Sequence, residues 1–468
     1  MPRHGTTRPG RVQPDRSLPQ HRTGQPRRNS PAAATPAPDN RQPLPAGMNA
    51  APATDTMQPF GRTVPVSTLV HADADARPCN AVPGGTPDRF IHARSFHRAL
   101  SGWHYTEYPE DGGFDAMLQA QLRRNGEILL GVQQRTGCRI LLAQKAFSNF
   151  NVYPVLAPYL AGTEASGLYE SRLGREELPE KENHVFCAAY RADEMDELVQ
   201  YADHIVFNSE RQLRKHVDKC RAVGVSVGLR INPECSTQGD HALYDPCAAG
   251  SRFGVRIDQF SEDLLDLVDG LHFHTLCEQN SDDLKTTLDA VEAKFGPYLH
   301  RIKWLNMGGG HHVTREDYDL DLLISSIQHM QETYGLEVYI EPGEAIALNA
   351  GYLVTEVLDI FENGIETLVL DASATCHMPD VLEMPYRPPL RHGFEAGEKA
   401  YTYRLSSNTC LTGDIIGDYS FEKPVEIGDK LYFEDMAIYS FVKNNTFNGI
   451  GLPSLVLMDK TGDCRIVK

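Results

Sequence analysis

Short apolar runs alternate along the middle of the chain with longer stretches in which apolar residues recur at helical spacing. The runs are continuously apolar, which is typical of strands buried on both faces of a parallel sheet. Eight of them occur, at residues 139–146, 162–166, 184–189, 204–208, 225–232, 270–275, 302–307 and 338–341. The stretches between them predict helices, including 194–201, 210–223, 281–294 and 318–334.

Eight strand and helix units in succession predict an α/β fold, a closed TIM-like (β/α)8 barrel over residues 96–345. A doubly wound open sheet is the structural alternative. It does not need eight units, and no Gly-x-Gly-x-x-Gly opens the first helix.

The pattern changes after residue 345. Strand-like segments at 353–360, 367–372, 401–405, 430–433 and 437–441 are separated by Gly, Pro and Asp turns, and no long helical pattern appears. We therefore expect a C-terminal, mostly antiparallel β domain over residues 346–468.

Residues 1–95 differ in composition from the rest. The first 50 contain eight arginines, no lysine and ten of the thirty prolines, with almost no large apolar residues. Such a segment cannot bury enough surface to offset chain entropy, so we expect residues 1–95 to be disordered. A basic nucleic-acid arm is one interpretation. The favoured interpretation is a functionless extension, or a translation start assigned too far upstream, with Met48 and Met57 as later candidates.

Charge and cysteine content narrow the function. The chain has 468 residues, with 45 Lys+Arg against 63 Asp+Glu and a net charge of −18. This acidity argues against a nucleic-acid partner, and no apolar run approaches the length of about 20 residues that a membrane span needs. The ten cysteines form no Cys-x-x-Cys pair, so we expect no metal site, and reduced thiols in a cytoplasmic protein.

The ends of three predicted strands carry unusual chemistry. Lys145 ends the first run, Gly308, Gly309 and Gly310 follow the seventh, and Glu341 follows the eighth. Each has an ordinary interpretation: a snorkelling lysine, a tight turn and a solvated loop acid. Together, an amine nucleophile, a phosphate-binding turn and a buried acid are the parts needed to hold pyridoxal 5'-phosphate.

Residues 120–455 resemble the alanine-racemase-fold group of pyridoxal-phosphate decarboxylases. Within that group the chain looks most like the carboxynorspermidine/carboxyspermidine decarboxylases. The motifs that carry the resemblance are LLAQKAFS at 141–148, HFHTLCEQ at 272–279, NMGGGHH at 306–312, EPGEA at 341–345, HMPDVLEMPYRP at 377–388 and LTGDIIGDYS at 411–420.

The resemblance implies roles for individual residues. Lys145 matches the lysine that bonds to the cofactor aldehyde, and His274 matches the histidine stacked on the cofactor ring. Gly308, Gly309 and Gly310 match the phosphate-binding glycines, and Glu341 matches the acid at the pyridine nitrogen. Further matches are an active-site arginine, Arg230, and a tyrosine of the β domain that reaches the phosphate, Tyr439.

The resemblance also implies a homodimer with shared active sites. Cys410 matches a cysteine that enters the neighbouring subunit's site and donates a proton after carbon dioxide leaves. We expect four acids to bind the amines of a polyamine tail: Asp371, Asp380, Glu383 and Asp414.

Two positions depart from the group's pattern. Ser406-Ser407-Asn408-Thr409 stands before Cys410, where a Gly-Gly-Pro-Ser type of turn is usual. Glu344 stands where ornithine-type relatives place an arginine at the phosphate, and this glutamate resembles the carboxynorspermidine branch.

The expected activity is decarboxylation of carboxynorspermidine or carboxyspermidine to norspermidine or spermidine in polyamine biosynthesis. Alternatives are a decarboxylase of diaminopimelate or another basic amino acid, a racemase on the same barrel, and a non-catalytic regulatory homologue. Residues 378–391 contain acids alongside Arg387 and Arg391. Their charge therefore does not distinguish a carboxynorspermidine/carboxyspermidine decarboxylase from a diaminopimelate decarboxylase.

Overall fold

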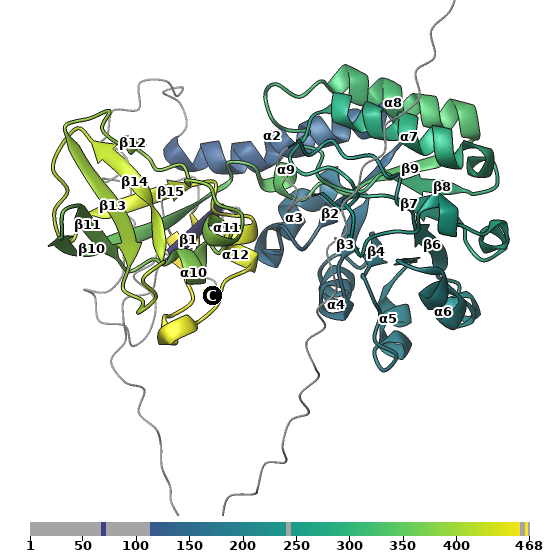
Figure 1. Cartoon of the computed structure of the whole chain (residues 1–468), viewed down its shortest axis with the longest axis horizontal. Helices are drawn as coiled ribbons and strands as arrows, with labels where there is room; N and C mark the ends of the chain where they lie inside the picture. Colours follow the sequence, from purple (N-terminus) through teal and green to yellow (C-terminus); the bar gives the residue numbers. More distant parts are fainter. Residues whose placement is uncertain (1–66, 72–112, 240–244, 459–463, 467–468) are drawn as a thin grey trace, which may run out of the picture. The chain divides into compact units, whose positions relative to one another are not determined.

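The computed structural model describes residues 67–71, 113–239, 245–458 and 464–466 (Figure 1). All of them belong to one compact unit, residues 60–468.

Within these residues, eight parallel strands pair in chain order and close into a barrel, with the last strand against the first. The barrel confirms the fold class expected from the sequence. Its strands are β2 (Arg139–Ala143), β3 (Gly162–Ala165), β4 (Glu182–Phe186), β5 (His204–Phe207), β6 (Ser226–Arg230), β7 (Gly270–His272), β8 (Trp304–Asn306) and β9 (Glu337–Ile340).

Helices follow the barrel strands and cover their outer face (Figure 1). The long ones are α2 (Gly113–Thr136), α4 (Leu168–Glu177), α5 (Met195–Tyr201), α6 (Glu210–Ala222), α7 (Ser281–Leu299) and α8 (Leu320–Tyr334). Short turns of helix are η3 (Phe150–Val152), α3 (Tyr153–Leu156), η4 (Ala157–Tyr159), η6 (Ile257–Gln259), η7 (Glu262–Asp266) and α9 (Glu344–Ala347).

Local sequence explains the ends of these helices. The Ser209 side chain accepts a hydrogen bond from the Gln212 amide and begins α6, whose buried residues recur at three- and four-residue spacing. Asp319 caps α8 in the same way through the Leu322 amide. Gly335 ends α8 with a left-handed φ of 72°.

Trp304 fills the interior of the barrel because its neighbours are glycines. A Cβ atom on Gly270 would lie 2.0 Å from the Trp304 ring, and one on Gly228 would lie 2.4 Å from it. The indole Nε1 donates to Ser226 Oγ at 3.0 Å, which satisfies the buried donor. This layer makes the barrel a packed core below the carboxyl ends of its strands.

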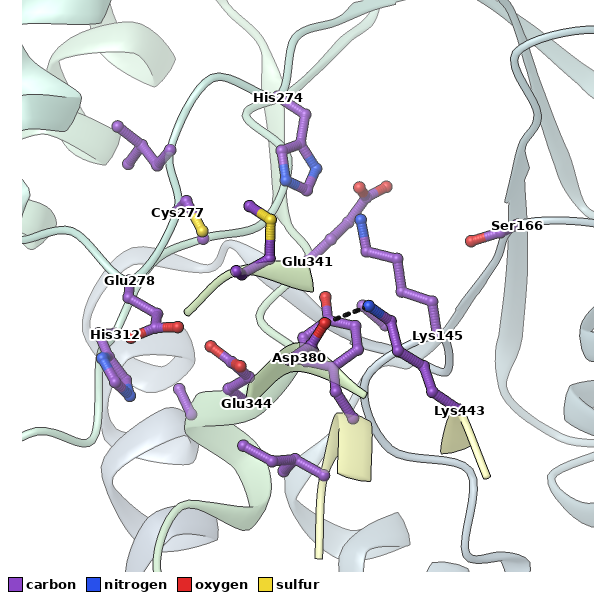
Figure 2. A pocket seen from close by; sticks show the side chains of 18 of the residues that line it. Lys145, Ser166, His274, Cys277, Glu278, His312, Glu341, Glu344, Asp380 and Lys443 are labelled. Carbon is purple, nitrogen blue, oxygen red and sulfur yellow. Dashed lines mark hydrogen bonds and ion pairs between the residues drawn. The ribbon is translucent and has the colours of Figure 1, made fainter. Parts of the chain in front are cut away.

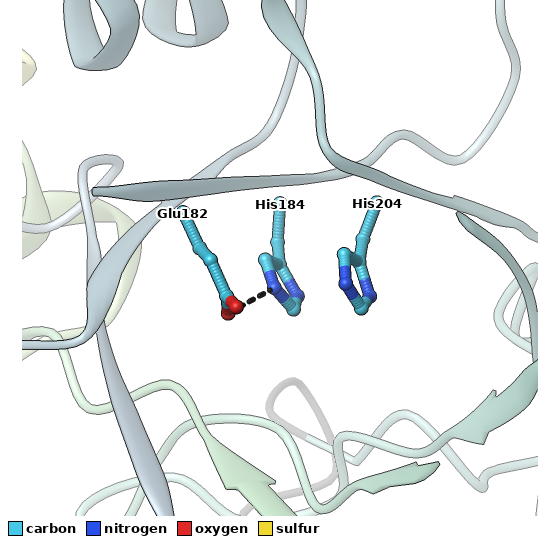
Figure 3. Close-up of side chains that lie close together, drawn as sticks. All are labelled: Glu182, His184 and His204. Carbon is cyan, nitrogen blue, oxygen red and sulfur yellow. Dashed lines mark hydrogen bonds and ion pairs between the residues drawn. The ribbon is translucent and has the colours of Figure 1, made fainter. Parts of the chain in front are cut away.

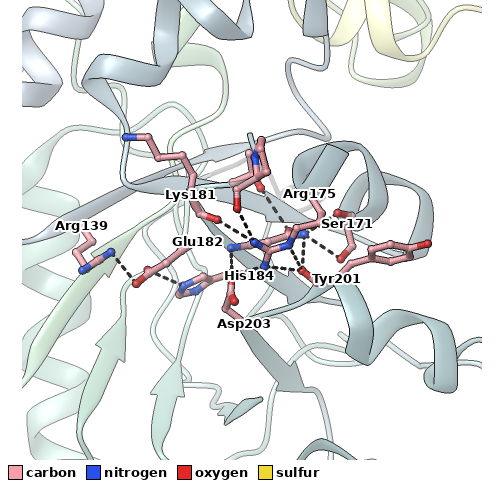
Figure 4. A network of polar contacts seen from close by, with 11 residues as sticks. Arg139, Ser171, Arg175, Lys181, Glu182, His184, Tyr201 and Asp203 are labelled. Atoms are coloured by element: carbon pink, nitrogen blue, oxygen red, sulfur yellow. Dashed lines mark hydrogen bonds and ion pairs between the residues drawn. The ribbon is translucent and has the colours of Figure 1, made fainter. Parts of the chain in front are cut away.

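A polar network joins helices α4 and α5 to the amino ends of β4 and β5 (Figure 4). Arg175 Nη2 donates to the Tyr201 carbonyl at 2.8 Å and to Asp203 Oδ2 at 2.6 Å. The same Asp203 oxygen accepts from the Asn183 amide at 2.8 Å. These bonds satisfy backbone groups at the end of the barrel away from the strand carboxyl termini.

The second body of the unit is a nine-stranded sheet among the described residues, in the order β12-β14-β13-β11-β10-β1-β16-β17, with β15 also on β10. The β1–β16 and β11–β13 pairs are parallel and the rest are antiparallel. Its strands are β1 (Ser67–His71), β10 (Gly351–Glu362), β11 (Glu366–Leu370), β12 (Phe394–Glu395), β13 (Tyr401–Ser407), β14 (Ile415–Phe421), β15 (Lys430–Glu434), β16 (Ser454–Met458) and β17 (Cys464–Ile466).

Short helices lie between these strands: α10 (Ala374–His377), α11 (Asp380–Glu383), α12 (Tyr439–Val442) and η8 (Phe447–Gly449). The sheet has its own apolar core, which includes Leu368, Leu405, Tyr419 and Phe433. The mostly antiparallel character agrees with the expectation from sequence, whereas the boundary at residues 345 and 346 stays a prediction.

The structure corrects two expectations about elements. Residues 437–441 were expected to form a strand, but 439–442 form helix α12. The partner strand β10 begins at Gly351, opposite the end of β15, and Asp435 turns the chain with a φ of 56°. An extended continuation would therefore have no neighbour on β10, and the last turn closes instead from the Lys443 amide to the Tyr439 carbonyl.

Strand β1 lies inside residues 1–95, which were expected to be disordered, so that expectation is wrong for residues 67–71. Composition averages over a long segment and misses a short strand that two neighbours, β10 and β16, can pair. The rest of residues 1–95 lies outside the described residues.

Candidate active site

A cavity of about 1220 Å³ lies at the carboxyl ends of the barrel strands (Figure 2). Its lining combines residues after β2, β3, β6, β7 and β9 with residues from α11, α12 and their neighbours. Eight residues singled out in the sequence line it: Lys145, Arg230, His274, Gly310, Glu341, Asp380, Glu383 and Tyr439.

Glu341 is a buried carboxylate at the end of β9, 3 % exposed. Its oxygens accept from Asn306 Nδ2 at 2.5 Å and from His272 Nε2 at 3.2 Å. Burial opposes its charge, but His272 and the Asn306 amide outweigh burial, so the pKa of the Glu341 carboxyl is lowered. Burial also lowers the pKa of His272, which keeps that imidazole a neutral donor. The cavity floor therefore carries a fixed negative charge.

His274 presents a neutral imidazole to the cavity. Its Nδ1 accepts a hydrogen bond from the Gly309 amide at 3.2 Å, which leaves the proton on Nε2. Burial, followed by the nearby Lys145 ammonium, lowers the pKa of His274 well below its ordinary value. A neutral ring with a fixed orientation suits a flat stacking surface.

The glycine run after β8 is required by close packing. Gly308 and Gly310 have φ values of 71° and 80°. A Cβ atom would lie 2.3 Å from the Phe273 carbonyl oxygen at Gly308, and 2.0 Å from the Leu276 oxygen at Gly310. The Gly308 amide donates to Asn306 Oδ1 and the Gly309 amide to His274. Gly308 and Gly309 thus support neighbouring site residues, Gly310 lines the cavity, and the phosphate-binding role of all three stays a prediction.

Arg230, at the end of β6, is buried against two aromatic rings. Its guanidinium carbon lies 4.6 Å from the Phe186 ring centroid and 4.5 Å from that of Phe253. Nη2 donates to the His274 carbonyl at 2.8 Å. Burial lowers the pKa of Arg230 to about 10. Arg230 therefore braces the strand end that carries His274.

Glu164 lines the cavity and was not singled out in the sequence. It lies on β3 and is 4 % exposed. Burial and then the Glu341 charge raise the pKa of its carboxyl, while Lys145 opposes the rise. A glutamate inside the segment 162–166, predicted to be a buried strand, was the signal available in the sequence.

The part of the cavity near α9 and α11 is rich in acids (Figure 2). Burial, then the neighbouring Glu278, raises the pKa of Glu344 to about 9. Burial raises the pKa of Asp435 to about 6. Glu278 holds a left-handed φ of 52°, a conformation that a non-glycine residue adopts at a cost. Glu278 lies inside the motif at 272–279 but was given no role of its own there, and Asp435 lies in a loop with no motif.

Lys443 is the cation among these acids. Its Nζ donates to Asp380 Oδ1 (Figure 2). It also donates to Glu383 Oε2 at 3.3 Å. Burial lowers the pKa of the Lys443 ammonium, but the two carboxylates outweigh burial and raise it overall. The lysine was not singled out in the sequence because it follows a segment interpreted as a strand.

Three predicted site residues do not line this cavity: Cys410, Asp371 and Asp414. Asp371 is buried in the sheet and accepts from Thr355 Oγ1 at 2.5 Å and the Glu356 amide at 2.8 Å. Within its own chain Asp371 joins β10 to the end of β11. It was expected to face the cavity, but it does not line it.

Asp414 is 1 % exposed and holds the loop between β13 and β14. Its Oδ2 accepts from the hydroxyls of Ser373 and Ser407 at 2.7 Å and of Thr409 at 2.5 Å. Asp414 therefore lies outside the cavity of its own chain, and the substrate contact expected for it stays a prediction. Ser407 and Thr409, which replace the usual turn residues, thus have a structural partner.

Cys410 is exposed on the same loop. Its amide donates to Asn448 Oδ1 at 2.9 Å, which fixes the backbone beside the thiol. Cys410 lies outside the cavity of its own chain, and its role as a proton donor to a second copy stays a prediction.

Glu182, His184 and His204 form another close cluster, at the amino ends of β4 and β5 (Figure 3). The two imidazoles stack with centroids 3.9 Å apart and an interplanar angle of 11°. Their in-plane lone pairs therefore run nearly parallel rather than toward one point, and Arg139 pairs with Glu182 at 2.6 Å. Burial lowers the pKa of both histidines to about 3. We attribute this cluster to packing of neutral rings.

A family model described as the pyridoxal-dependent decarboxylase, C-terminal sheet domain, matches residues 67–437. A carboxynorspermidine/carboxyspermidine decarboxylase of Campylobacter jejuni is 39 % identical over 359 residues, which is 74 % of this chain and 93 % of the relative. A carboxyaminopropylagmatine decarboxylase of Synechocystis is 41 % identical over 345 residues, 73 % of this chain and 88 % of the relative.

Among solved structures, carboxynorspermidine decarboxylase from Campylobacter jejuni in complex with norspermidine superimposes with a TM-score of 0.69. It is 38 % identical and covers 75 % of this chain and 94 % of its own. In the described part of the chain, no helix has the length and apolar character needed to cross a membrane.

Proposed function

The chain belongs to the pyridoxal-dependent decarboxylases, and on this premise we propose that its substrate is a carboxylated polyamine, carboxynorspermidine or carboxyspermidine. The protein is thus a carboxy-lyase that uses pyridoxal phosphate. The acid-rich part of the cavity carries the choice of substrate, since each amine of a polyamine tail needs an opposing carboxylate.

The cavity residues fit pyridoxal phosphate. Lys145 offers the amine for the aldehyde, His274 a neutral face for the ring, and Glu341 a carboxylate that stays ionised despite its burial. When bound, the cofactor supplies an electron sink for the bond pair left behind as carbon dioxide departs. Gly310 and Tyr439 line the cavity where the phosphate would be held.

The chain's own groups prepare this chemistry. The lowered pKa of Glu341 lets its oxygens keep a proton on the ring nitrogen, and Asn306 and His272 stop the carboxylate from rotating away. The Gly309 amide and Arg230 fix His274, so its ring needs no rearrangement when the cofactor is present. The enclosed barrel mouth limits the access of water to the reacting carbon.

Diaminopimelate is a weaker candidate because its distal end carries a carboxylate. Neither arginine of residues 378–391 lines the cavity. Arg387 pairs with Glu395, and Arg391 pairs with Glu434 at 3.0 Å. A distal carboxylate would face Glu278 and Glu344, and the nearby cation, Lys443, is already paired with Asp380 and Glu383.

The arrangement of Cys410 supports a further proposal, a homodimer in which each loop carrying Cys410 supplies a proton donor to the other copy's cavity. The thiol is exposed and the loop is held by Asp414. A cytoplasmic location stays a prediction from the cysteine content.

One assay tests the substrate. Carbon dioxide release is measured with carboxynorspermidine, carboxyspermidine, carboxyaminopropylagmatine and diaminopimelate side by side, with the Lys145→Ala variant as the inactive control. We expect the highest kcat/KM on one of the first two compounds. Preference for carboxyaminopropylagmatine would move the assignment to the Synechocystis relative's reaction; epimerisation without carbon dioxide release would contradict decarboxylation.

A further inference from the structure

Lys443 caps the carboxyl end of α12, and its side chain lies beside Asp380 of α11 (Figure 2). It bonds Asp380, the first residue of α11, and Glu383, the last. All three side chains line the cavity. Tyr439, one helical turn before Lys443, has its ring centroid 5.6 Å from the Lys443 nitrogen. The lysine is therefore part of the cavity wall on the acidic side.

The acids that Lys443 bonds are two of those expected to bind the substrate's amines. A lysine ammonium and the terminal ammonium of a polyamine are the same chemical group, each with three donors on a flexible alkyl chain. A carboxylate pair that is satisfied by Lys443 is less available to a ligand cation. Lys443 thus supplies from within the chain the same ammonium group that a polyamine tail would supply.

We propose that Lys443 is an internal counter-ion that occupies the distal amine subsite until the substrate's terminal ammonium displaces it. Lys443 thereby sets how strongly the enzyme selects for a terminal amine. This inference rests on the proposed function, because it requires an amine-tailed substrate.

The structure supports an exchange of this kind. The Lys443 side chain is 38 % exposed, so its ammonium can move into water without crossing packed protein. The Asp380 side chain is only 22 % exposed, and the backbone that carries Asp380 and Glu383 is fixed because bonds from the Glu383 and Met384 amides close α11. Without any cation, the two carboxylates would face Glu278, Glu344 and Asp435 across the same cavity. The counter-ion therefore keeps the acids ionised and in place until the ligand arrives.

Competition between Lys443 and the ligand's terminal ammonium predicts how the dissociation constant should change. If Lys443 occupies the subsite for most of the time, the apparent dissociation constant of an amine ligand is raised by the ratio of closed to open states. Removing the lysine should lower that constant, whereas a ligand without the terminal amine should be indifferent to the change.

The experiment compares Lys443→Met with Lys443→Arg in the cofactor-loaded full chain. The ligands are carboxynorspermidine and its analogue with a methyl group in place of the terminal amine. KM and kcat are measured for both, and norspermidine binding is measured by calorimetry. We expect Lys443→Met to lower KM for carboxynorspermidine and the norspermidine dissociation constant by about fivefold or more. KM for the analogue should stay unchanged, and Lys443→Arg should resemble the parent.

Three results would overturn the inference. Weaker norspermidine binding in Lys443→Met would mean that the lysine assists the ligand, and equal changes for both substrates would mean that it does not sense the terminal amine. Loss of bound cofactor, read from its visible absorbance, would assign Lys443 to the phosphate instead. Carbon dioxide release by the parent enzyme distinguishes failure of the proposed function from failure of this inference. A parent enzyme that is inactive on carboxynorspermidine contradicts the proposed function. An active parent enzyme whose Lys443→Met variant does not bind amines more tightly contradicts this inference alone.

Discussion

At the scale of single residues, the groups around each buried acid decide what it does. Glu341 and Asp414 are both nearly inaccessible, yet hydrogen-bond donors keep each ionised. Glu344 and Glu164 have carboxylate neighbours, and the pKa of each is raised. The sequence shows all four as the same kind of side chain, so only their surroundings separate a cofactor acid from a loop anchor.

Asp414 gives a pH-dependent expectation. Burial disfavours its charge, but the Thr409, Ser373 and Ser407 hydroxyls outweigh burial and lower its pKa below the ordinary value of 3.8. Its stabilising effect is therefore present above that value and is lost as the pH falls through the lowered pKa. Asp414→Asn should reduce the free energy of unfolding by about 1–3 kcal/mol at pH 7. Denaturant unfolding of both proteins should show the difference shrinking below pH 4; a difference that grows there would contradict the assignment.

At the scale of elements, the barrel and its helices follow from periodicity. The eight apolar runs became β2 to β9, and the four helices expected at 194–201, 210–223, 281–294 and 318–334 became α5 to α8. Residues 437–441 show the limit of prediction from the sequence pattern. Their pattern favours a strand, but the partner strand β10 has already ended, and residues 439–442 form a helix. Strands β14 and β16 were not foreseen, because Gly and polar residues interrupt the apolar pattern of β14 and β16 lies beyond the last segment interpreted.

Packing around Trp304 gives an expectation for an element. Gly270→Ala would place a Cβ atom 2.0 Å from the indole ring, so β7 or Trp304 must shift. We expect a loss of about 1–3 kcal/mol in the free energy of unfolding. Gly131→Ala is the matched control, because nothing lies within 4 Å of its Cβ in α2 and alanine favours helix. Equal effects of the two substitutions on the thermal midpoint would argue against the close contact.

At the scale of the whole molecule, residues far apart in the chain complete one another. The cavity joins barrel strand ends to residues near 380 and 440, and the sheet pairs residues 67–71 with strands that begin at 351 and 454. Neither association has a local pattern. The homodimer implied by the family resemblance belongs to the same scale and stays a prediction.

Subunit mixing tests the shared site. Lys145→Ala and Cys410→Ala homodimers should each have low activity, because one lacks the cofactor amine and the other the proton donor. After mixing and subunit exchange, a heterodimer contains one cavity with both groups intact, so activity should recover to about a quarter of the parent level. Activity is measured as carbon dioxide release. The control is a mixture of two separate preparations of the full-length Lys145→Ala variant. No recovery despite exchange, checked by mass-tagged subunits, would count against an interfacial Cys410.

Truncation tests the role of β1. Removing residues 1–71 deletes a strand that pairs with both β10 and β16, so the thermal midpoint should fall. Removing residues 1–59, which lie outside the compact unit 60–468, should leave the midpoint and the activity close to those of the full chain. Equal midpoints for the two truncations would show that β1 contributes nothing.

The family resemblance singled out His274. The sequence by itself determined the barrel, the mainly β character of the C-terminal part and the position of Lys145 and Glu341 at strand ends. Those features depend on local periodicity and on the rule that parallel strands present their carboxyl ends at one rim. Only the tertiary structure decided that Asp414 anchors a loop, that Glu278 and Asp435 join the acids of the cavity, and that Lys443 pairs with Asp380. The reason is physical: ionisation and pairing depend on which distant groups share a desolvated space, and nothing in the spacing of residues along the chain encodes that distance.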